Sequence, residues 1–104
     1  MNQYNRLENA KAYIKDRLTP EELLAQLAEE AAELTHAALK LRRALDGTNP
    51  TPMHIQTAME NIKEEVADVR LLVQLLMLDS KPGEIEEIMN HKILRWQRRL
   101  IESE

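Results

Sequence analysis

No cysteine and no phenylalanine occur among the 104 residues of this chain, and glycine occurs only twice. Without cysteine the chain forms no disulfide and no thiolate metal site. The scarcity of aromatic residues argues against a sheet-rich fold, which normally draws on β-branched and aromatic side chains. Alanine, leucine, glutamate, lysine, arginine and glutamine dominate, and all are good helix formers. The composition therefore predicts an all-α protein with a single domain over residues 1–104.

A long hydrophobic run is also missing. The longest apolar stretch, 71–78, is interrupted by Gln74 and is far too short to cross a membrane. The first residues lack the basic-then-apolar order of a signal peptide, so we expect a cytoplasmic protein with no membrane partner. The net charge of −4 argues against duplex nucleic acid as a partner, because no uniformly basic face is expected.

Three short segments that contain proline divide the chain. In the first, Thr19, Pro20 and Glu22 form the pattern of an N-cap, a proline in the first turn and a capping box. The second spans 46–52 and ends in another cap-and-proline pair, and the third spans 79–83. Because short connections make helices antiparallel neighbours, these breaks predict a four-helix-bundle type of fold. The helices are expected at 2–17, 20–45, 53–78 and 83–101.

Three of these helices carry apolar residues with the i, i+3, i+4, i+7 spacing of a buried stripe. The expected stripe residues are Leu23, Leu27, Ala31, Leu34, Ala38, Leu41 and Leu45, then Ile55, Met59, Ile62, Val66, Val69, Val73 and Leu76, then Ile85, Ile88, Met89, Ile93, Trp96 and Leu100. Segment 71–78 is apolar almost all round, and such a helix has to be buried on every side. We therefore predict an oligomer of at least two chains.

Two acidic pairs stand on the second and third predicted helices. Glu30 and Glu33 are three residues apart, as are Glu65 and Asp68, so each pair lies on one helix face. Glu30 falls within its apolar stripe, Glu65 falls beside Val69, and the other two lie at the stripe edge. Facing carboxylates at such a seam lose hydration and repel one another. A hard divalent cation compensates for this most simply, so the sequence predicts a site for Mg²⁺, or for Mn²⁺ in its place.

The last predicted helix offers positive charge. Lys92 projects into its apolar stripe, and Arg95 and Arg99 lie along the adjoining edge. Such a group can neutralise carboxylates or bind phosphate oxygens, which makes these three residues candidates for substrate binding. Arg98 has an ordinary explanation, because cations are favoured near helix C-termini.

Residues 27–34 (Leu-Ala-Glu-Glu-Ala-Ala-Glu-Leu) and 64–69 (Glu-Glu-Val-Ala-Asp-Val) resemble the paired motif of MazG-type nucleotide pyrophosphohydrolases. That motif is Glu-x-x-Glu on one helix and Glu-x-x-Asp on the next. The basic segment 92–96 is similar to the last helix of short, often prophage-encoded members. The resemblance implies an all-α, Mg²⁺-dependent enzyme, a homodimer or a dimer of dimers, that hydrolyses nucleoside triphosphates to monophosphates and pyrophosphate.

The resemblance also assigns roles to individual residues. It implies that Glu30, Glu33, Glu65 and Asp68 are the catalytic metal ligands, and that Lys92 and Arg95 contact phosphate. The general base stays open between Glu29, Glu33 and Glu64. The long stretch between the two motifs, with its loop at 46–52, departs from the family pattern and leaves base and sugar preference undetermined.

Two readings from other classes compete with an enzyme. Acidic pairs on helices are mostly solvated faces, and in that case the chain is a non-catalytic helical interaction module. Alternatively, the chain is a sensor that binds Mg²⁺ and nucleotide without turnover. A response to divalent ions separates the first alternative from the enzyme, and turnover separates the second.

Overall fold

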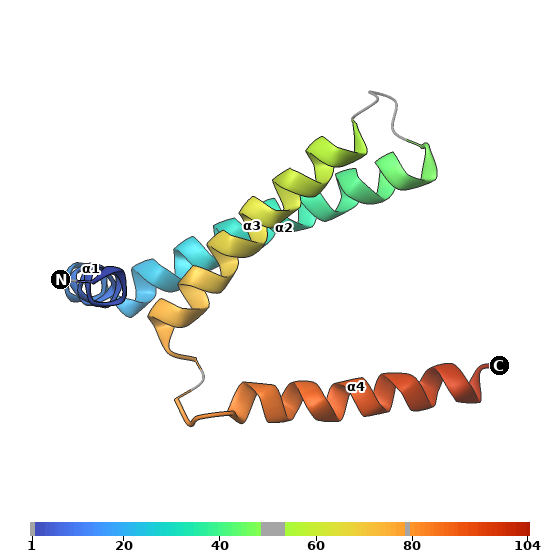
Figure 1. Cartoon of the computed structure of the whole chain (residues 1–104). Coiled ribbons are helices and arrows are strands. Elements are labelled where there is room, and N and C mark those ends of the chain that lie inside the picture. The colour runs from blue at the N-terminus through green and yellow to red at the C-terminus, as the bar shows by residue number, and fades with distance from the viewer. Residues whose placement is uncertain (1, 49–53, 79) are drawn as a thin grey trace.

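The computed structural model describes residues 2–48, 54–78 and 80–104. These ranges contain four helices and no strand (Figure 1). The helices are α1 (Gln3–Arg17), α2 (Pro20–Asp46), α3 (Ile55–Leu76) and α4 (Glu84–Glu102). The all-α class and the four helices are confirmed, and each helix end lies within two residues of its expected position.

Local hydrogen bonds explain where α2 and α3 begin. The predicted capping box is present, since the Glu22 backbone N–H donates to Thr19 Oγ1 at 3.1 Å and the Thr19 N–H donates to Glu22 Oε1 at 3.2 Å. Helix α3 begins after His54, whose Nδ1 accepts the Gln56 backbone N–H at 3.2 Å. The second predicted cap, at Thr51, lies outside the described residues.

Helices α2 and α3 form an antiparallel hairpin (Figure 1). Among the described residues, these two helices pack against each other far more extensively than any other pair. The buried and half-buried positions along this seam repeat with alternating steps of three and four residues, the a/d pattern of a coiled coil. The seam consists of Leu23, Leu27, Glu30, Leu34, Ala37, Leu41 and Ala44 from α2 and of Ala58, Ile62, Glu65, Val69, Leu72 and Leu76 from α3. Most of these residues are apolar, and the two that are charged are both glutamates.

The prediction of which apolar residues are buried was wrong in part. Six of the residues expected in the core of α2 and α3 are exposed: Ala31, Ala38, Leu45, Ile55, Met59 and Val66. Five of those expected on α4 are exposed as well: Ile88, Met89, Ile93, Trp96 and Leu100. The expected stripe followed the wide apolar arc of a helix that is covered from several directions. Two helices alone cover only a narrower seam, so Ala37 is buried, Ala44 is half-buried, and the residues beside the seam stay uncovered.

The hairpin consequently has two unlike sides. In an antiparallel pair of helices, the residues that directly follow a seam residue in the sequence lie on one side of the hairpin, whichever helix they belong to. The residues that directly precede a seam residue lie on the other side. The side we call the apolar side carries Leu24, Ala31, Ala38, Leu45, Met59 and Val66. The side we call the polar side carries Gln26, Glu33, Lys40, Asn61 and Asp68.

Helix α1 crosses one end of the hairpin. Its Ile14 packs against a small core of Leu23, Leu72 and Leu75. This contact covers the end of the hairpin where α2 begins and α3 ends, and it leaves the middle of the polar side open.

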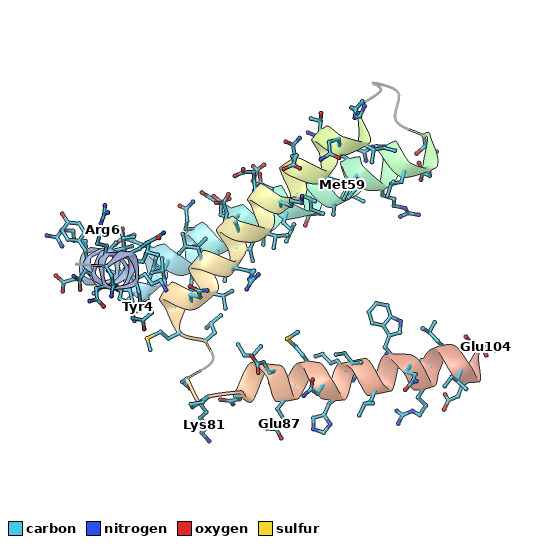
Figure 2. All side chains as sticks on the ribbon, in the orientation of Figure 1. Tyr4, Arg6, Met59, Lys81, Glu87 and Glu104 are labelled. Atoms are coloured by element: carbon cyan, nitrogen blue, oxygen red, sulfur yellow. The ribbon has the colours of Figure 1, made fainter. Side chains whose placement is uncertain are left out.

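Helix α4 stands apart from the hairpin (Figure 1). The connection contains two residues in the left-handed region, Met77 (φ 53°) and Gly83 (φ 80°), and glycine adopts this conformation without strain. Figure 2 draws side chains all around α4 with no other element packed over them, and Trp96 is 68% exposed. Within the described ranges, no helix is long and apolar enough to span a membrane.

Candidate metal centre

Three carboxylates converge in the middle of the hairpin. One oxygen each of Glu30, Glu65 and Asp68 lies within 4.8 Å of the other two. Glu30 comes from α2 and the other two from α3, so the antiparallel pairing of the helices brings them together. Glu30 and Glu65 are half-buried seam residues, whereas Asp68 is exposed on the polar side.

Glu65 is the least satisfied group of this cluster. Its Oε2 atom is buried and has no hydrogen-bond partner among the described residues. Burial raises the pKa of Glu65, and the charges of Asp68, Glu30, Glu33 and Glu64 raise it further. The raised pKa means that the ionised carboxylate is less favourable here than in water. A proton or a bound cation relieves this.

Among the residues that the structure describes, no basic side chain forms an ion pair with the cluster. The ion pairs found in the described ranges involve neither Glu30 nor Glu33, and neither Glu65 nor Asp68. Glu30 instead accepts a hydrogen bond from a neutral side chain, since Gln26 Nε2 donates to Glu30 Oε1 at 3.0 Å. Oxygen ligands with one buried, unpaired acceptor match the donor set that Mg²⁺ and Mn²⁺ prefer, so the residues present fit the predicted metal.

Of the four predicted ligands, Glu33 is placed differently from the rest. It does not belong to the converging group of three, but it lines a pocket that Glu65 also lines. Since Glu33 stands one helical turn beyond Glu30 on α2, the two differ mainly in height along the hairpin. Glu33 therefore lies between the converging carboxylates and the pocket.

The pocket beside the cluster has a volume of about 310 Å³. Its walls are polar, and its floor consists of Ala37 and Ala58, which are 8% and 1% exposed. Both floor residues occupy seam positions, and their small side chains leave the space between the helices unfilled. The full lining is Glu33, His36, Ala37, Lys40, Ala58, Asn61, Glu64 and Glu65.

Three of the polar lining residues were not predicted as site residues from the sequence: His36, Lys40 and Asn61. Spacing holds a signal that could have identified two of them. Lys40 follows Glu33 by seven residues and Asn61 precedes Asp68 by seven, so each shares the side of its carboxylate in a heptad seam. Lys40 forms no ion pair within the described ranges, which leaves its ammonium group available to an anion.

The structure does not bring the cations of α4 to the carboxylates. Lys92, Arg95 and Arg99 surround a shallow depression on α4 itself, together with Trp96 and Leu100. Because α4 stands apart from the hairpin of its own chain, a role of these cations in substrate binding stays a prediction.

The three carboxylates predicted as candidates for a general base lie in two different places. Glu33 and Glu64 line the pocket next to Glu65. Glu29 lines a different hollow, between α1 and the end of the hairpin, together with Ile14 and Leu18. A base must lie within hydrogen-bond reach of the water that it activates, which favours the first two.

Comparison with known proteins finds no matching family model, no matching curated protein and no matching solved structure.

Proposed function

We propose that this protein is a Mg²⁺-dependent nucleoside triphosphate pyrophosphohydrolase, which cleaves between the α and β phosphates to give a monophosphate and pyrophosphate. The observation that carries the proposal is the convergence of Glu30, Glu65 and Asp68 around a buried oxygen that has no partner. A polar pocket that opens directly beside this cluster supplies room for a substrate. The resemblance of segments 27–34 and 64–69 to the MazG motif points to the same reaction.

The four predicted carboxylates would hold the metal. Glu30, Glu65 and Asp68 provide the converging oxygens, and Glu33 stands one turn above them at the pocket wall. Bound Mg²⁺, or Mn²⁺ in its place, supplies a positive centre for phosphate oxygens and lowers the pKa of a water molecule. Glu33 or Glu64 would accept the proton of the attacking water, because both line the pocket.

Lys40 provides the positive charge of the pocket. It stands two turns of α2 beyond Glu33, which places its backbone about 10 Å farther along the groove. Its ammonium group would bind the phosphate oxygens of the substrate and hold the charge that develops on leaving pyrophosphate. His36 and Asn61 offer hydrogen bonds to the remaining parts of the substrate.

An oligomer is part of the proposal. We expect a homodimer or a dimer of dimers, because the apolar side of the hairpin and the apolar residues of α4 are both uncovered in a single chain.

The test is a product analysis over a panel of canonical and modified nucleoside triphosphates with Mg²⁺. Equal amounts of monophosphate and pyrophosphate are expected. Release of orthophosphate with a diphosphate left behind contradicts cleavage between the α and β phosphates. Mg²⁺-dependent nucleotide binding without turnover identifies a sensor instead. Absence of any response to divalent ions identifies a non-catalytic interaction module.

A further inference from the structure

Two apolar surfaces of this chain lie uncovered at the same time. One is the apolar side of the hairpin, where Leu24 is 48% exposed and Val66 is 37% exposed. The other is the apolar face of α4, which carries Ile85, Ile88, Met89, Ile93, Trp96 and Leu100. These α4 residues follow the helical i, i+3, i+4 spacing and therefore form one stripe.

The size of the exposed surface matches what a stable dimer hides. The chain exposes 8661 Å², whereas a compact monomer of this mass exposes about 6,000 Å². Its radius of gyration is 17.8 Å, against about 13 Å expected for a compact domain of this length. The chain thus exposes about 2,600 Å² more than a compact monomer would. If each of two chains hid half of this excess area in an interface, the dimer would bury about 2,600 Å² in total. That area lies in the range of obligate homodimers.

We propose that α4 is exchanged between two copies of this chain, so that the apolar face of α4 from one copy lies on the apolar side of the partner hairpin. A helix stripe of large side chains fits a groove between two helices, and the small Ala31 and Ala38 allow a close approach. The arrangement is reciprocal, as twofold symmetry requires.

The departure of α4 from its own hairpin favours a second copy as the occupant. The chain turns away after α3 through Met77 and Gly83, both in the left-handed region, and α4 then projects as an arm. An arm that leaves its own groove uncovered and carries a matching apolar face is the geometry from which identical chains exchange elements.

This assembly leaves the polar side of the hairpin free. The pocket and the carboxylates lie on the polar side and at the seam, and α4 would cover the opposite side. The inference goes beyond the proposed function and needs no turnover for its test.

The single tryptophan makes docking of α4 measurable in the whole protein. Sedimentation equilibrium and Trp96 emission are recorded over a dilution series. We expect a dimer with blue-shifted emission at micromolar concentration. Dilution should produce the monomer and a red shift over the same concentration range. A monomer with blue-shifted emission would mean that α4 folds onto its own hairpin, and this overturns the proposal. A monomer or a dimer with fully exposed Trp96 also overturns it.

An isotope-mixing experiment separates exchange from a dimer in which each α4 packs on its own chain. Chains labelled with nitrogen-14 and nitrogen-15 are unfolded together, refolded and cross-linked through lysine. Cross-linked peptides that join Lys92 of α4 to Lys63 of α3 are then weighed. Exchange predicts pairs that contain one light and one heavy peptide. Pairs of a single isotope only would refute exchange.

A matched pair of substitutions tests the groove itself. Val66→Glu places a charge on the apolar side, and Ala67→Glu places the same charge one residue on, at an outward position. Val66→Glu should shift the dimer dissociation constant upward at least tenfold and expose Trp96, while Ala67→Glu should leave both unchanged. Helix content by circular dichroism shows that each variant is folded. An intact dimer of folded Val66→Glu chains argues against this surface as the interface.

Discussion

The two sides of the α2–α3 hairpin share one seam and one pair of helices, yet they are incomplete in opposite ways. The polar side contains carboxylates without an ion-pair partner among the described residues, and it contains a pocket with polar walls. The apolar side contains exposed side chains such as Leu24 and Met59 and has no converging polar group. The polar side is therefore suited to bind a metal ion and an anionic ligand, and the apolar side is suited to bind a protein surface.

A single helical position decides to which side a residue belongs. Residues just before a seam position stand on the polar side, and residues just after it stand on the apolar side. Glu30 and Glu65 occupy the seam itself, so their carboxylates are partly withdrawn from water. This placement separates them from ordinary surface glutamates, because desolvation raises the pKa of Glu65 before any neighbouring charge is considered.

Substitution of the converging carboxylates should produce the largest effect. Asp68→Asn keeps the size of the side chain but removes its charge, and we expect pyrophosphate release to fall by roughly 10²–10³-fold, as for loss of a preorganised electrostatic group. Glu60→Gln is the matched control, since Glu60 is exposed on the outer face of α3 and pairs with Lys63. If the Asp68→Asn variant kept full activity, the carboxylates of the polar side would have no part in the reaction.

Metal binding should stabilise the fold through the polar side alone. Mg²⁺ or Mn²⁺ at a hundredfold excess over its dissociation constant adds about 2.7 kcal/mol, because the ion binds the folded arrangement only. For a domain of this size, that gain raises the melting temperature by roughly 10 °C or more. Differential scanning calorimetry measures the shift. Glu65→Gln should abolish it, whereas Ala67→Glu should keep it.

Lys40 should matter for substrate binding and less for metal binding. Lys40→Ala removes a charged hydrogen-bond donor worth about 1.5–3 kcal/mol, so kcat/KM should fall about 10-fold to 100-fold. Lys40→Arg should restore part of the loss, because it returns the charge. Lys63→Ala is the control, as Lys63 pairs with Glu60 outside the pocket. If Lys40→Ala and Lys63→Ala have equal activities, the pocket does not bind the phosphates.

The smallest expected effect is the pH dependence of stability without metal. Because the pKa of Glu65 is raised on folding, the folded state holds this proton more tightly than the unfolded state. Stability should therefore fall as pH rises from the ordinary glutamate pKa through the raised one, and the full loss is present above that window. Urea unfolding at several pH values measures this slope. In Glu65→Gln the slope should be smaller, and stability near neutral pH should equal or exceed that of the wild type.

The sequence predicts the helices and the seam position of Glu30 and Glu65, because helix periodicity and proline breaks are local signals. It could not decide which apolar residues are covered, since that depends on how many elements pack around each helix. Ala31 and Met59 follow the helical period yet remain exposed. The pocket was missed because two alanines from different helices, Ala37 and Ala58, line it, and each alone is unremarkable in the sequence.

The two alanines at the floor of the pocket leave room for a ligand, but they contribute less to the stability of the fold than larger side chains would. An unfilled space in a helical seam lacks the packing contacts that a larger side chain would make there. A substitution such as Ala58→Leu offers those contacts, so selection for thermal resistance alone would tend to close this space. A larger residue at Ala37 or Ala58 would therefore be expected to raise stability and to reduce the volume of the pocket.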